Sequence, residues 1–137
     1  MRLSNIFKHD ETVFYFDSLE VLIGLKKSLK DCYHILQSST IDNYNEVFDM
    51  CANTFNKISE IIDDFIRNWE KDEDKICSTL SSSKDYIEYY IRLCDTSTEK
   101  NYKANMKYMM DSIETILLVF DSKINYINGE KLKNNLF

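Results

Sequence analysis

Residues 41–69 read IDNYNEVFDMCANTFNKISEIIDDFIRNW, and this stretch decides the fold class. Its apolar side chains recur at alternating spacings of three and four residues, which is the repeat of one face of an α-helix. The repeating positions are Ile41, Tyr44, Phe48, Cys51, Phe55, Ile58, Ile62, Phe65 and Trp69. Polar residues fill most of the positions between them. The pattern predicts a long amphipathic helix over residues 41–71.

The same periodicity predicts three further helices, over residues 10–37, 74–95 and 98–128. The apolar seam expected for the third of the four helices is Ile76, Leu80, Ser83, Ile87, Tyr90 and Cys94. Small polar residues at Ser81–Ser83 dilute this seam, so the sequence leaves open whether the helix is continuous there. We expect Gly24 at a close contact between helices. We expect the last helix to end at Gly129, because glycine favours the left-handed conformation that follows many helices.

The joins between the four predicted helices are only two or three residues long. Such short joins favour antiparallel neighbours. The sequence therefore predicts one all-α domain over residues 1–137, an up-down four-helix bundle with a short polar tail at 130–137. A fused third and fourth helix, or a dimer that completes the bundle, are the alternatives. We expect no internal repeat.

Composition excludes several classes of protein. The 137 residues contain no proline and two glycines, too few for a turn-rich fold or a glycine-rich nucleotide-binding loop. Acidic residues outnumber basic ones by 23 to 17, and a net charge of −6 argues against direct binding of nucleic acid. No apolar run approaches the roughly 20 residues of a membrane span, and the N-terminal residues lack the apolar stretch of a signal peptide. We therefore expect a cytoplasmic protein, in the host cytoplasm if a virus or phage encodes it.

Residues that carry catalysis or bind metals are sparse. The two histidines, His9 and His34, lie 25 positions apart and outside any known catalytic or metal-binding pattern. The four cysteines occupy positions 32, 51, 77 and 94 without a CxxC pair, which favours buried, reduced thiols over a zinc site. We therefore expect no enzymatic activity and no cofactor.

Three tyrosines crowd the third helix beside Leu93. Tyr86, Tyr89 and Tyr90 cannot all face the core at helical spacing. Exposed tyrosines often anchor protein interfaces. We expect the outer face of this helix to be a binding surface, although tyrosines that bridge core and rim fit the pattern equally well.

A stripe of lysines marks the start of the fourth helix. Lys100, Lys103 and Lys107 lie in its first turns, where positive charge opposes the helix dipole. Residues 60–74 hold seven acids and two bases, a net charge of −5, and they belong at the other end of an up-down bundle. We hypothesise that these opposite charges promote head-to-tail or partner contacts, which adds the three lysines to the candidate binding surface.

Parts of residues 3–95 resemble the PhoU-like helical proteins associated with the regulation of phosphate transport. The first similar segment is residues 5–8, which are followed by Phe14, Phe16 and Leu19-Glu20. The other two are Ser59–Phe65 and Glu73–Tyr89. Metal-binding carboxylates of that family follow a Glu-x-x-x-Asp pattern, which Glu60 and Asp64 match. The resemblance implies a regulator with a carboxylate metal site at these two residues.

The first functional interpretation is a non-enzymatic helical protein that acts by protein–protein binding. It would be an accessory, immunity or regulatory protein, such as a virus, phage or mobile element encodes, and its partner would be another protein or a second copy. One alternative is the PhoU-like regulator. The other is an acidic inhibitor that mimics the charge of nucleic acid, in keeping with the net charge of −6.

Overall fold

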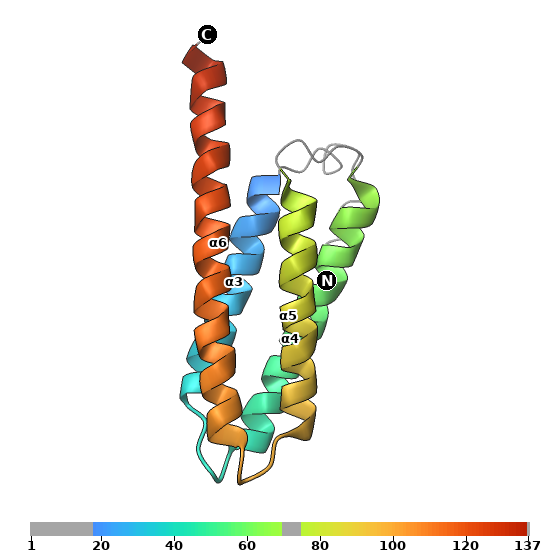
Figure 1. Ribbon diagram of the computed structural model, residues 1–137, viewed down its shortest axis with the longest axis vertical. Helices are drawn as coiled ribbons and strands as arrows, with labels where there is room; N and C mark the ends of the chain where they lie inside the picture. Colours follow the sequence, from blue (N-terminus) through green and yellow to red (C-terminus); the bar gives the residue numbers. More distant parts are fainter. Residues whose placement is uncertain (1–17, 70–74, 137) are drawn as a thin grey trace.

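A computed structural model of the protein describes residues 18–69 and 75–136, and these residues form four α-helices and no strand. The helices are α3 (Ser18–Gln37), α4 (Tyr44–Asn68), α5 (Ile76–Thr96) and α6 (Tyr102–Leu136). Consecutive helices run in opposite directions, and short corners join α3 to α4 and α5 to α6 at the lower end of Figure 1. The predicted all-α, up-down four-helix bundle is confirmed.

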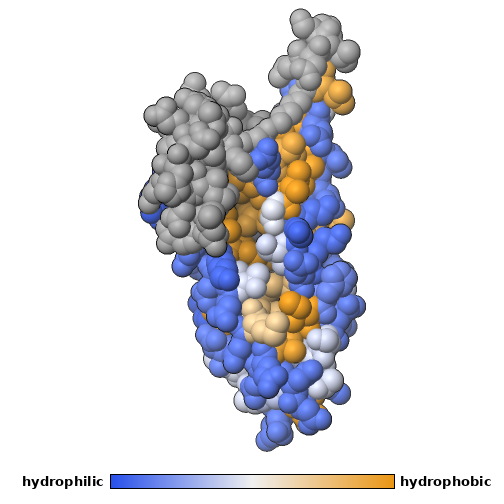
Figure 2. All heavy atoms as spheres, turned by 180° about the vertical axis from the view of Figure 1, so that it is seen from behind, coloured by the Kyte–Doolittle hydropathy of each residue, from blue (hydrophilic) through white to orange (hydrophobic). Residues whose placement is uncertain are grey.

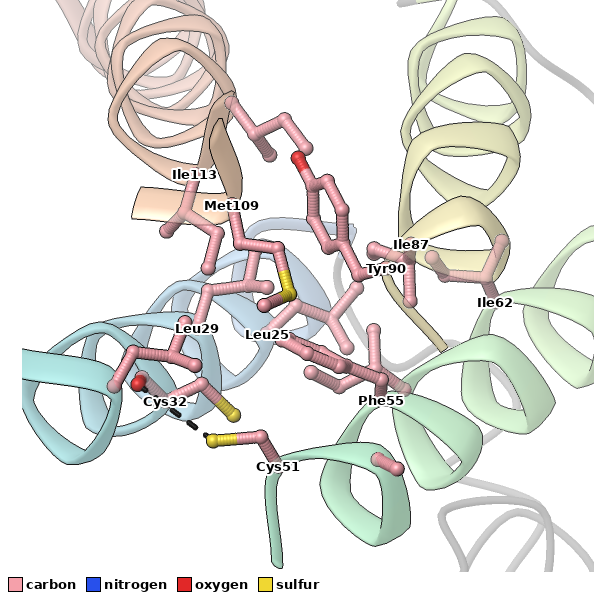
Figure 3. Packing of buried hydrophobic residues seen from close by; sticks show 14 of the residues in the cluster. Leu25, Leu29, Cys32, Cys51, Phe55, Ile62, Ile87, Tyr90, Met109 and Ile113 are labelled. Carbon is pink, nitrogen blue, oxygen red and sulfur yellow. Dashed lines mark hydrogen bonds between the residues drawn. The ribbon is translucent and has the colours of Figure 1, made fainter. Parts of the chain in front are cut away.

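The apolar seams of the four helices meet in one core. Figure 3 shows side chains from all four helices pointing into it, among them Leu29, Phe55, Tyr90 and Ile113. All six seam residues predicted for α5 are buried. On α4 the predicted seam is buried from Tyr44 to Phe65, whereas Ile41 is exposed because it lies in the corner before the helix.

The cysteines add sulfur to one region of this core. Cys32, Cys51 and Cys94 are buried, Cys77 is half-buried, and none of the four forms a disulfide. The Sγ of Cys51 lies 3.9 Å from the carbonyl oxygen of Cys32 (Figure 3). The Sγ of Cys94 lies 3.8 Å from the Sδ of Met109. The prediction of buried, reduced thiols holds for three of the four residues.

The helices do not pack equally. α4 lies closely along α5, where Lys84 forms an ion pair with Asp63 (2.9 Å), and α3 lies closely along α6. In the second pair Lys26 contacts Asp121 at 2.5 Å, and the hydroxyl of Tyr33 donates a hydrogen bond to Glu114 at 2.6 Å. α5 and α6 contact each other least of these neighbouring pairs. The bundle is therefore open along the α5–α6 side.

Several predicted boundaries need correction. α4 begins at Tyr44 rather than at residue 41, and it ends at Asn68 rather than at residue 71, since Trp69 already has an extended backbone. α5 runs unbroken through Ser81–Ser83, where the Ser83 hydroxyl donates a hydrogen bond to the Thr79 carbonyl at 2.9 Å. The predicted helix over residues 10–17 and the acids at 70–74 lie outside the described residues.

Both expectations for the glycines were wrong. A Cβ added at Gly24 would meet no atom within 4 Å, so no other helix approaches closely there. Gly129 lies inside α6 and does not have a positive φ, and the helix continues to Leu136. As a result α6 extends past the other helices in Figure 1.

An internal repeat, which we did not expect, appears in the two lower corners. Ser39-Thr40-Ile41-Asp42-Asn43-Tyr44 and Ser97-Thr98-Glu99-Lys100-Asn101-Tyr102 share the pattern S-T-x-x-N-Y. In both corners the threonine N–H donates a hydrogen bond to the asparagine Oδ1 at 2.6 Å, and the tyrosine N–H donates one to the threonine carbonyl at 2.9 Å. The bundle thus consists of two related hairpins, α3–α4 and α5–α6.

Seen from behind, the described surface is mostly hydrophilic, with a strip of hydrophobic side chains running along it (Figure 2). This arrangement is expected where amphipathic helices meet, because each buries only one face. Of the four helices described, none combines the length and the apolar character needed to span a membrane.

Candidate functional site

The loose packing between α5 and α6 leaves a groove of about 490 Å³ on the surface. Hydroxyl-bearing side chains make up most of its lining, namely Ser78, Thr79, Ser82, Ser83, Tyr86, Ser112 and Thr115. Ile116 and Val119 of α6 supply its aliphatic part. The groove is therefore walled mainly by small side chains, which allow another chain to approach the two helices closely.

Several of these hydroxyl groups are satisfied within their own helix. Ser83 donates a hydrogen bond to the carbonyl of Thr79, Thr79 donates one to the carbonyl of Lys75 at 3.2 Å, and Thr115 donates one to the carbonyl of Asp111 at 3.3 Å. Because each hydroxyl group already donates its proton to a backbone carbonyl, it needs no other hydrogen-bond acceptor. This arrangement suits the packing of a helix better than the recognition of a polar small molecule.

The predicted tyrosine surface divides into two parts. Tyr86 and Tyr89 are exposed by 51% and 41%, as expected for a binding surface. Tyr90 is fully buried, its hydroxyl is hydrogen-bonded to Ser112 of α6, and its burial raises the pKa of the phenol. Leu93 is half-buried against the core. Tyr90 therefore belongs to the core rather than to the outer surface.

A tyrosine of α6, which the sequence did not lead us to expect, completes the aromatic cluster. The ring of Tyr108 lies edge-on to that of Tyr89, with centroids 5.5 Å apart, and 6.4 Å from the ring of Tyr90. On the other side, the guanidinium of Arg92 lies 5.6 Å from the centre of the Tyr89 ring. These contacts hold Tyr89 across the junction of α5 and α6.

The exposed apolar side chains concentrate on this side of the molecule. Among the described residues ten large apolar side chains are exposed, and five of them lie on α5 or on the adjoining stripe of α6. We call these five residues the α5–α6 face: Tyr86, Tyr89, Tyr108, Val119 and Tyr126.

Helical spacing explains how these residues come together. On α5 the positions 79, 82, 86, 89 and 93 follow spacings of three and four, directly beside the core seam. On α6 the positions 108, 112, 115, 119, 122 and 126 do the same. Each helix thus carries a second seam. This second seam is hard to recognise in the sequence because serine and threonine occupy many of its positions.

Four charged residues flank the part of the α5–α6 face around Tyr89 and Tyr108: Asp85 and Arg92 on α5, and Lys107 and Asp111 on α6. All four are exposed, and none forms an ion pair with another residue of the described chain. Their charges sum to zero. This part of the face is therefore apolar at its centre and electrically balanced at its edges.

The predicted lysine stripe lies at the lower end of the bundle. Lys100, Lys103 and Lys107 are exposed, and Lys100 precedes the first residue of α6. Glu60 and Asp63 lie near the end of α4, at the opposite end of the bundle (Figure 1). The acids Asp95 and Glu99, however, lie close to the lysines in the chain. The hypothesis that opposite charges drive contact stays a prediction.

The predicted metal-binding pair occupies two different environments. Glu60 is exposed, whereas Asp64 is buried and lies 3.8 Å from the guanidinium of Arg67. Across residues 18–69 and 75–136, no group of three or more His, Cys, Asp or Glu side chains is placed to hold a metal ion. Metal binding at Glu60 and Asp64 stays a prediction.

No known family model matches the chain, and no curated protein or solved structure is significantly similar to it.

Proposed function

We propose that this is a non-enzymatic helical protein that acts by binding another protein chain through its α5–α6 face. The observation that carries the proposal is the gathering of five exposed, large apolar side chains beside an open groove. Exposed apolar residues scattered singly are normal, but a contiguous group on a surface marks a binding site. Tyrosine is also among the residues that contribute most to the free energy of association at interfaces.

The groove supports a helical segment as the bound element. Two parallel stripes of small and aromatic side chains, one from each helix, provide a channel into which the ridge of a third helix can fit. The hydroxyl groups of Thr79, Ser83 and Thr115 already donate hydrogen bonds to backbone carbonyls, so such a partner need not supply acceptors for them. We infer an accessory or regulatory role from this mode of binding, because the protein would act by binding a helix of its partner in the groove.

Site-specific photo-cross-linking in the native cells tests the proposal. The photoreactive residue p-benzoylphenylalanine would replace Tyr86 in one variant and Lys57, which is exposed on α4, in the control. We expect defined protein adducts, identified by mass spectrometry, from position 86 and not from position 57. Equal labelling from the two positions would contradict the proposal.

A pair of alanine variants provides a second test. Tyr86→Ala combined with Tyr89→Ala removes the two exposed aromatic side chains of α5 and should abolish the adduct formed from a photoreactive residue at position 119. Met50→Ala is the matched control, because Met50 is similarly exposed but lies on α4. Persistence of the adduct in the double tyrosine variant would remove the α5–α6 face as the binding site.

A further inference from the structure

We propose that the part of the α5–α6 face around Tyr89 and Tyr108 binds the same part of a second copy of the chain, in an antiparallel dimer. The inference rests on the proposed function, because it names the partner of that face. Two observations carry it: the order of the charges along the edges of the face, and the position of the tyrosines between them.

On α5 the charges at the edge of the face have a direction. Asp85 and Arg92 are seven residues apart, which is two helical turns, so they lie on the same side of the helix about 10 Å apart. Because α5 runs downward in Figure 1, Asp85, near the middle of the helix, lies above Arg92. The edge of α5 is thus acidic above and basic below.

α6 repeats the same order although it runs the other way. Lys107 and Asp111 are one turn apart on one side of the helix. Because α6 begins at the lower end of the bundle, Lys107 is the lower residue and Asp111 the upper one. Around Tyr89 and Tyr108, both edges of the face therefore present an acid above a base.

This shared order makes the part of the face around Tyr89 and Tyr108 complementary to itself when one copy is inverted. A twofold axis that crosses the helices at right angles brings the acids of one copy opposite the bases of the other, so Asp85 lies opposite Arg92 of the second copy. A twofold axis parallel to the helices would instead place Arg92 near Lys107 of the second copy, because both lie at the lower end. Like charges across an interface disfavour that arrangement.

The tyrosines lie where the inverted copy would make its closest contact. Tyr89 is between Asp85 and Arg92 in the chain, and its ring already contacts Tyr108, which is between Lys107 and Asp111. An interface with aromatic side chains at its centre and charged residues around them has the usual anatomy of a specific complex. The four flanking charges also sum to zero, so they favour a copy of this face over a partner of strong net charge.

Exchanging the charges tests the arrangement directly. We expect the full-length protein to be a dimer by sedimentation velocity. Arg92→Asp should weaken dimerisation about tenfold or more, because two acids then meet at both symmetric contacts. The double variant Asp85→Arg/Arg92→Asp exchanges the two partners and should restore the dimer. Lys57→Asp on α4 makes the same change in charge away from the face and should leave the dimer intact, and circular dichroism checks the fold of every variant.

The outcomes separate this inference from the proposed function. A wild-type protein that stays monomeric, or a dimer as stable in Arg92→Asp as in Lys57→Asp, would overturn the inference. Either result leaves the proposed function standing if position 86 still cross-links to a different protein in cells. Absence of any adduct from position 86, including one with a second copy, would contradict both.

Discussion

Tyr44 and Tyr102 stack their rings at the lower end of the bundle, with centroids 4.8 Å apart and planes inclined by 16°. Each tyrosine is the first residue of its helix and follows the same S-T-x-x-N-Y corner. An offset of 58 residues relates the two corners, and the same offset pairs buried residues along the hairpins, such as Leu29 with Ile87 and Phe55 with Ile113. The stacked pair therefore joins two equivalent points of a repeated hairpin.

The asparagine of each corner should contribute to stability. Asn43→Ala and Asn101→Ala each remove an acceptor for a backbone N–H, and we expect each to lower the free energy of unfolding by about 1 kcal/mol. Asn45→Ala is the matched control, because Asn45 is exposed just after the first corner. Urea unfolding measures the three values. A loss in the control as large as in the corner variants would show that the corner bonds are not responsible.

The two glycines offer a gain in stability. Both lie in helices without a positive φ, and an added Cβ meets open space at each. We expect Gly24→Ala to raise the free energy of unfolding by about 0.5–1 kcal/mol, because alanine loses less backbone entropy in a helix. Gly129→Ala should act in the same direction. Ala104→Gly, at an exposed position of α6, should have the opposite effect, and thermal unfolding compares all three.

Buried and exposed tyrosines of α5 should respond differently to truncation. Tyr90→Ala should cost about 3–5 kcal/mol, since it removes a fully buried ring that packs 5.3 Å from Phe55. Tyr90→Phe keeps the ring but loses the hydrogen bond to Ser112, at a cost of about 1 kcal/mol. Tyr86→Ala should change stability by less than about 0.5 kcal/mol, because Tyr86 is exposed. Equal losses at positions 86 and 90 would contradict the assignment of Tyr90 to the core.

Much of the fold could be predicted from the spacing of apolar residues in the sequence. A repeat such as that of α4 identifies the face of the helix that is buried. The α5 seam likewise placed Tyr90 in the core, even though the crowding of tyrosines pointed to the surface. Local signals were weaker guides. Gly129 suggested a helix end, but the residues after it, Glu130 to Lys133, favour helix and α6 continues. The α6 part of the α5–α6 face was missed because Ser112, Thr115 and Ser122 interrupt its apolar pattern.

Alkaline pH should destabilise the protein through the buried thiol of Cys94. Burial raises the pKa of Cys94 to about 12, from an ordinary value near 9. Between these two values the unfolded chain loses the Cys94 proton while the folded chain keeps it, so the free energy of unfolding falls as pH rises. The contribution of the Cys94 thiol to the free energy of unfolding is fully present below about pH 9 and is lost progressively between about pH 9 and pH 12.

Urea unfolding at neutral pH and at alkaline pH measures this loss. Cys94→Ala should be less stable than the wild type at neutral pH, because it removes a buried sulfur, but its stability should fall less steeply toward alkaline pH. Identical pH dependence in the two proteins would show that Cys94 does not ionise in this range on unfolding.

The lysines at the start of α6 separate stability from binding. The first turn of α6 contains no acidic residue, and Lys103 places a positive charge at the positive end of the helix dipole. Lys103→Glu should therefore raise the free energy of unfolding by about 0.3–1 kcal/mol at low salt, with a smaller gain at high salt. Lys57→Glu in the middle of α4 is the control, since the dipole acts only near helix ends. If Lys103 also contacts a partner, the same variant should gain stability, and its binding to that partner should no longer depend on salt. A variant that is more stable and binds unchanged would leave the lysine stripe without a role in recognition.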